Sequence, residues 1–76
     1  MTLLDFAKAM ENELIANSDK GGWQDCSLQY LINRLKQELG ELERAIAKNE
    51  SKHRIVSEAA DVANFSMMIA DNYEEQ

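Results

Sequence analysis

The 76-residue sequence contains no proline, and only three of its residues are glycine. Those two residue types usually mark the turns of all-β domains, and no segment alternates apolar and polar residues over a useful length. Both absences argue against a sheet. The sequence therefore predicts an all-α chain, and its length allows one thin domain covering residues 1–76.

Cysteine is nearly absent as well, since Cys26 is the single one. One thiol excludes an internal disulfide, which is the usual support of small secreted domains. The sequence shows no signal-peptide pattern, and its longest apolar run, from Met67 to Ala70, is far too short to cross a bilayer. We therefore expect a cytoplasmic protein without a membrane partner.

Positive charge is scarce, because eight Lys and Arg residues stand against fourteen Asp and Glu residues. The net charge of −6 argues against duplex nucleic acid as a partner, since the phosphate backbone needs a basic surface. The same charge does not exclude a nucleotide, because bound metal ions reverse the local field.

Three amphipathic segments, each preceded by a residue type that commonly caps helices, account for nearly all of the chain. The predicted helices extend from Thr2 to about Asn17, from Asp25 or Ser27 to about Lys48, and from Ser51 to about Tyr73. Thr2 and Asp5 have the spacing of a capping box. The polar segment 48–51 predicts a turn, so the second and third helices are expected to form a hairpin.

Helical periodicity predicts an apolar face on each helix. These faces comprise Leu3, Phe6, Ala7, Met10, Leu14 and Ile15; then Leu28, Leu31, Ile32, Leu35, Leu39, Leu42 and Ile46; then Ile55, Val56, Ala59, Val62, Ala63, Met67, Ile69 and Ala70. The third face is an unusually wide arc. Such an arc on a short chain implies burial on two sides, so we expect a second subunit to cover it, centred on Val56, Ala63 and Met67.

Four acidic residues form two pairs with i, i+3 spacing, Glu38 with Glu41 and Glu58 with Asp61, so each pair shares one side of its helix. In the predicted hairpin Glu41 and Glu58 lie equally far from the turn, and so do Glu38 and Asp61. Four carboxylates therefore meet at one level. Like charges this close repel strongly away from water, which favours a bound cation, and oxygen ligands suit Mg²⁺. The alternative is a plain acidic face.

Two further side chains are notable for their positions. Trp23 follows Gly21 and Gly22, and a tryptophan beside such a turn either caps the core or stacks on a base. Asn64 lies about one turn beyond Asp61 on the third helix. Neither residue by itself distinguishes a binding site from ordinary packing.

The acidic pattern, with sixteen residues between Glu41 and Glu58, resembles that of the MazG-like all-α nucleotide pyrophosphohydrolases. Residues 30–42, YLINRLKQELGEL, look like the first metal helix of that family, and residues 58–65, EAADVANF, look like its second. The segment from Lys20 to Trp23 is similar to one in compact, often phage- or mobile-element-associated members. The resemblance covers about Met10 to Asp71.

This resemblance implies hydrolysis of a nucleoside triphosphate, with a deoxynucleotide as the expected substrate, to monophosphate and pyrophosphate, in house-cleaning or control of the nucleotide pool. It implies Mg²⁺, replaceable by Mn²⁺, at the four acids, one of whose glutamates accepts a proton from water. The implied substrate-binding residues are Lys20, Trp23, Arg34 and Asn64, with Arg54 as a further candidate cation.

The wide apolar face of the third helix favours a two-fold pairing of hairpins into a four-helix bundle, and the family includes both homodimers and homotetramers. Many members have a further helix whose basic residues bind phosphate. This sequence shows no such helix, so we expect a neighbouring subunit to supply part of the pocket. The competing interpretation is a non-enzymatic acidic helical module for protein–protein interaction, in which the acids only solvate the surface.

Overall fold

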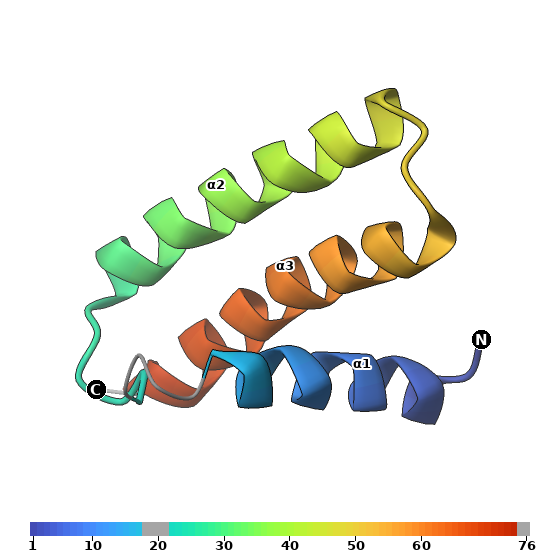
Figure 1. Cartoon of the computed structure of the whole chain (residues 1–76). Coiled ribbons are helices and arrows are strands. Elements are labelled where there is room, and N and C mark those ends of the chain that lie inside the picture. Colours follow the sequence, from blue (N-terminus) through green and yellow to red (C-terminus); the bar gives the residue numbers. More distant parts are fainter. Residues whose placement is uncertain (18–21, 75–76) are drawn as a thin grey trace.

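The computed structural model describes residues 1–17 and 22–74, and these residues form three α-helices without a strand (Figure 1). The helices are α1 (Leu3–Ala16), α2 (Leu28–Ala47) and α3 (Lys52–Asn72). The all-α prediction is confirmed, and the predicted helix ends agree closely with the observed ones.

Side-chain caps explain where the helices begin. The Thr2 hydroxyl accepts the Asp5 main-chain N–H at 3.1 Å, and the Asp5 carboxylate accepts the Thr2 N–H at 3.0 Å, which confirms the capping box. Ser27, rather than Asp25, caps α2, since its hydroxyl accepts the Tyr30 N–H. Ser51 caps α3 as predicted.

The turn between α2 and α3 depends on Asn49, which has a φ of 54°. Asparagine tolerates this left-handed conformation better than most residues. The Asn49 N–H donates to the Ile46 carbonyl and the Glu50 N–H to the Ala45 carbonyl, each at 3.1 Å, as in a Schellman motif. This turn returns the chain beside α2 and produces the predicted hairpin.

Helix α3 is the central element, because both α1 and α2 pack against it. Within the described residues α1 and α2 do not pack against each other. The wide apolar arc of α3 is therefore covered from two directions within one chain, and Val56, Ala63 and Met67 are half-buried. The docking of α1 was not indicated by the periodicity of the sequence, and the expectation that a second subunit also covers this arc stays a prediction.

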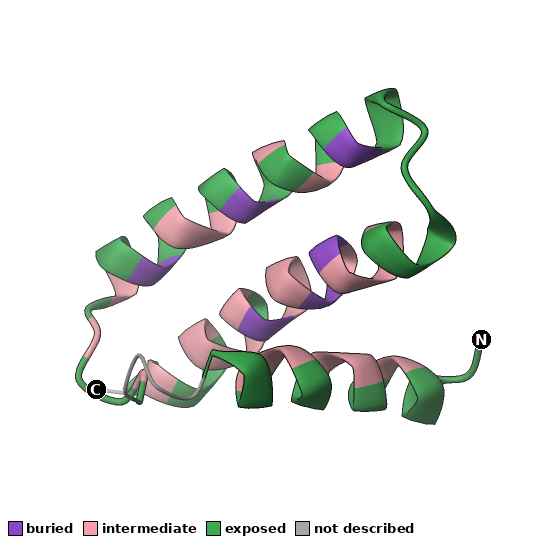
Figure 2. Ribbon diagram, in the orientation of Figure 1, coloured by how far each residue is buried: buried purple, intermediate pink, exposed green. Residues whose placement is uncertain are grey.

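The core is thin, and the buried positions lie on α2 and α3 (Figure 2). The fully buried apolar residues of the described chain are Leu31, Ala45 and Ala60. The radius of gyration is 13.0 Å, above the ~11 Å expected for a compact chain of this length. Many large apolar side chains stay exposed: Met1, Leu3, Leu4, Ile15, Tyr30, Ile32, Leu39, Ile46 and Tyr73.

On α1 and α2, the side that packs against the protein is rotated about the helix axis relative to the predicted apolar face. On α1, Leu3, Ala7 and Ile15 are exposed, and the side facing the protein contains Phe6, Ala9, Met10, Glu13 and Leu14. On α2, Ile32, Leu39 and Ile46 are exposed, whereas Glu38 is buried. Both helices are turned so that an acidic residue faces the interior.

Helices that combine enough length and apolarity to cross a membrane are absent from the described part of the chain.

Candidate functional site

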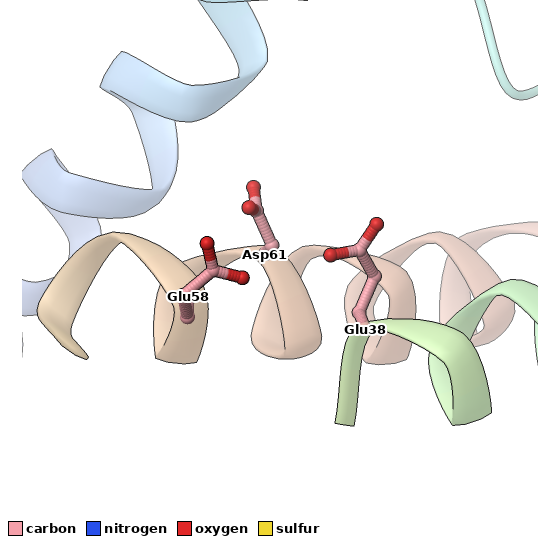
Figure 3. A group of neighbouring side chains, drawn as sticks. All are labelled: Glu38, Glu58 and Asp61. Carbon is pink, nitrogen blue, oxygen red and sulfur yellow. The ribbon is translucent and has the colours of Figure 1, made fainter. Parts of the chain in front are cut away.

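Three carboxylates from the hairpin converge on one point above α3 (Figure 3). Glu38 extends from α2, and Glu58 and Asp61 extend from α3. Each offers an oxygen, and these three oxygens lie within 4.8 Å of one another. This grouping follows from the hairpin register, which sets Glu38 level with Asp61 and places Glu58 one turn away.

Two of these carboxylates are almost completely removed from solvent, since Glu38 is 7% exposed and Glu58 is 4% exposed. An arginine one turn earlier on the same helix pairs with each: Arg34 with Glu38 at 2.9 Å, and Arg54 with Glu58 at 2.8 Å. Both arginines bind the Oε1 atom. The Oε2 atoms of Glu38 and Glu58 are buried and have no hydrogen-bond partner in the described residues. A buried acceptor left unpaired costs about 1–3 kcal/mol, and more when charged, so the arrangement favours a cation.

Burial raises the pKa of all three acids above their ordinary values. For Glu38, a hydrogen bond that its protonated form can donate to Glu41, and then the negative charge of Glu41, raise the pKa further, whereas Arg34 opposes the shift. For Glu58, Arg54 opposes the effect of burial on the pKa. The pKa of Asp61 rises to about 7. Burial is the largest cause, repulsion from the charge of Glu13 is the next, and no arginine compensates the charge of Asp61.

Glu41, the fourth predicted ligand, does not belong to the group of three. Its side chain is exposed, but it lines the same pocket and its charge acts on both Glu38 and Glu58. The structure thus brings three of the four predicted acids together and leaves Glu41 beside them.

Glu13 on α1 is a fifth acid that the sequence did not single out. It lines the same pocket, and its negative charge is, after burial, the largest influence that raises the pKa of Asp61. Its position depends on how α1 docks on α3, which no local pattern specifies. The sequence contained one signal: Glu13 places a charge between Met10 and Leu14, two apolar residues that face the rest of the protein.

A pocket of about 580 Å³ opens between α1 and α2 over α3. Its acidic lining residues are Glu13, Glu38, Glu41 and Asp61, and its apolar and aromatic lining includes Leu14, Trp23, Tyr30, Leu31, Phe65 and Met68. A pocket with both linings suits a ligand with a charged part and a flat apolar part.

Trp23 is half-buried and lines this pocket. Its indole N–H donates to the Asp71 carboxylate at 3.0 Å, and the Asn72 amide donates to the carbonyls of Trp23 at 2.7 Å and Cys26 at 3.1 Å. Asp71 lies ten residues beyond Asp61 on α3, about 15 Å along the helix axis. Trp23 therefore borders the end of the pocket near Asp71, away from Asp61 and the two glutamates grouped with it.

The other predicted substrate-binding residues have different positions. Arg34 lines the pocket, and its guanidinium lies 5.1 Å from the centre of the Phe65 ring. Arg54 is exposed and is paired with Glu58 and Glu50. Lys20 lies outside the residues that the structure describes.

Asn64 is 3% exposed and also lines the pocket. Its amide donates to the main-chain carbonyl of Met10 at 2.9 Å, which ties α3 to α1. Its Oδ1 atom is buried without a partner in the described chain. Asn64 thus has a structural contact on one side and an unused acceptor on the other.

Comparison of the chain with protein-family models, curated proteins and solved structures found no match. The function is therefore argued from the geometry of the site.

Proposed function

We propose that this chain is a Mg²⁺-dependent pyrophosphohydrolase that cleaves a nucleoside triphosphate between its α and β phosphates. The observation that carries the proposal is the pair of buried, unpartnered oxygens on Glu38 and Glu58, beside a third carboxylate on Asp61. Buried carboxylate oxygens without a partner, next to an acid that no arginine compensates, cost stability, so their retention favours a role that requires a cation.

Glu38, Glu58 and Asp61 fit a hard divalent cation, because all three ligands are carboxylate oxygens from rigid helices. The same set accepts Mn²⁺. Such an ion, when bound, neutralises the triphosphate and lowers the pKa of an attacking water. Glu41 borders the group without joining it, which suits it either to complete the ligand set or to accept the proton from that water.

Substrate contacts are assigned from the pocket lining. Arg34 stands between the acids and Phe65, where its guanidinium can pair with a phosphate once a cation satisfies Glu38. Trp23 is assigned to the base, and Asn64 offers its Oδ1 acceptor to a sugar hydroxyl or a base amino group. Lys20 remains a proposed phosphate contact.

The proposal includes self-association of the hairpin into a four-helix-bundle homodimer or homotetramer. Its support is the thin core together with the large apolar side chains left exposed on α2.

The testing experiment is a screen of the eight common NTPs and dNTPs for pyrophosphate release in the presence of Mg²⁺. We expect release from at least one nucleotide, lost in Glu58→Gln and retained in the matched control Glu11→Gln, whose carboxylate is exposed on α1. Melting with Mg²⁺ or Mn²⁺, with and without a nonhydrolysable dNTP, provides a second readout. No release and no shift in melting temperature would instead support the non-enzymatic interaction module.

A further inference from the structure

Helix α2 carries an exposed apolar strip beside the face that packs on α3. The strip consists of Ile32, Leu39 and Ile46, which are 36%, 43% and 56% exposed. Each follows directly after one of the three buried residues of α2, Leu31, Glu38 and Ala45. Successive helix residues are turned by about 100°, so this α2 strip lies to one side of the face that packs on α3.

The α2 strip belongs to a heptad pattern. Its residues recur every seven positions, and Leu28, Leu35 and Leu42 occupy the intervening positions at alternating spacings of three and four. A 3.5-residue repeat keeps one side of a helix against a partner helix over several turns. The three intervening leucines are half-buried beside α3, whereas the α2 strip has no cover within the described chain.

The strip is self-complementary when two copies of α2 run antiparallel with the two-fold axis at Leu39. Leu39 then meets Leu39 of the second copy, and Ile32 meets Ile46, because each lies seven residues from the axis. An isologous contact of this kind closes on itself without leaving an open end.

The charges beside the strip agree with this register. Lys36 and Glu43 are both exposed, and each lies one turn beyond a strip residue, on the edge away from α3. In the antiparallel register Lys36 of one copy falls beside Glu43 of the other, on both sides of the axis. A parallel pair would instead bring like charges to the same level. The charge pattern therefore favours the antiparallel pair.

We propose that a second copy of this chain docks on the α2 strip, antiparallel to the first, with the two-fold axis at Leu39. This inference deepens the oligomeric part of the proposed function and does not depend on the hydrolytic part. Glu38 lies on the face of α2 that packs on α3, about 100° around the helix from Leu39, so the carboxylate group and its pocket stay outside the contact.

The first test is sedimentation of the whole chain at micromolar concentration. We expect the wild type at twice the chain mass of 8.7 kDa. Leu39→Glu, which sets two carboxylates against each other at the axis, should raise the dimer Kd at least about a hundredfold, because opposed like charges in an interface are strongly unfavourable. The control Leu3→Glu adds the same charge at an 87% exposed leucine on α1 and should leave the dimer unchanged. A monomeric wild type, or equal dissociation by both variants, overturns the proposal.

Cysteine crosslinking in a Cys26→Ser background determines the register without requiring a destabilising charge. Leu39→Cys should form a disulfide-linked dimer by itself. Ile32→Cys should not crosslink alone but should do so when mixed with Ile46→Cys. Crosslinking of Ile32→Cys alone would indicate parallel pairing, and no crosslink at Leu39→Cys would place the contact elsewhere; either result contradicts the proposal. Pyrophosphate release, measured separately, keeps a failed interface distinct from a failed enzyme assignment.

Discussion

The buried amide of Asn64 on α3 donates to the main-chain carbonyl of Met10 on α1 at 2.9 Å, across 54 positions of the chain. This bond holds α1 where Glu13 and Leu14 form one wall of the pocket. The docking of α1 therefore controls both the volume of the pocket and the number of acids around Asp61.

Asn64→Ala should loosen this contact and lower the free energy of unfolding by about 1 kcal/mol, the usual net value of a hydrogen bond. Urea unfolding measures the change. Asn33→Ala is the matched control, because Asn33 accepts an exposed side-chain bond from Gln29 on α2, and its loss should stay within about 0.5 kcal/mol. Equal losses in the two variants would contradict a docking role for Asn64.

Each of Glu38→Gln, Glu41→Gln, Glu58→Gln and Asp61→Asn should reduce turnover at least about a hundredfold, as expected when the electrostatics of a metal site are lost. The metal-free fold should survive. Asp61→Asn should stabilise it, because Asp61 has repelling acids around it and no arginine compensates its charge. Steady-state kinetics and thermal melting check both parts. Near-normal turnover in two of the four variants would reject the acidic site.

The stability of the metal-free protein should fall as the pH rises from about 4 to about 7. The pKa of Asp61 is about 7 in the folded chain, above its ordinary value of 3.8, so the folded state holds a proton that the unfolded state has released. Stability falls with pH wherever the folded state binds more protons. The raised pKa values of Glu38 and Glu58 act in the same direction.

Melting temperatures measured between pH 4 and pH 8 test this dependence, at roughly 4–8 °C for each kcal/mol lost in a domain of this size. Asp61→Asn should flatten the profile, and saturating Mg²⁺ should restore stability near pH 7 by favouring the ionised acids. A metal-free melting temperature that rises steadily with pH would show that the carboxylates are not buried as described.

Trp23 should report on the pocket, because it is the single tryptophan and lines the cavity. Nucleotide added with Ca²⁺, which slows turnover, should change its emission. Asn72→Ala removes the amide that holds the Trp23 and Cys26 carbonyls, so it should make Trp23 more accessible to acrylamide and weaken the nucleotide response. Asn12→Ala, an exposed change on α1, is the control. An unchanged emission at saturating nucleotide would count against placing the base near Trp23.

The local elements could be predicted from the sequence because their signals are short-range. Thr2, Ser27 and Ser51 cap helices through bonds to main-chain groups three residues away. Asn49 closes the hairpin through a left-handed turn that few other residues accept. Once that turn is placed, counting residues sets Glu38 level with Asp61, so most of the acidic group follows from the spacing alone.

The tertiary structure alone decided how each helix is rotated about its axis. The apolar residues of α2 cover a wider arc than one neighbouring helix can bury, and periodicity does not say which part of that arc is covered. Packing on α3 buries Leu31 and Glu38 and leaves Ile32 and Leu39 exposed. The docking of α1 likewise brings Glu13 to Asp61 and covers the arc of α3. These outcomes depend on the summed free energy of contacts between residues far apart in the chain, and a local pattern does not contain that sum.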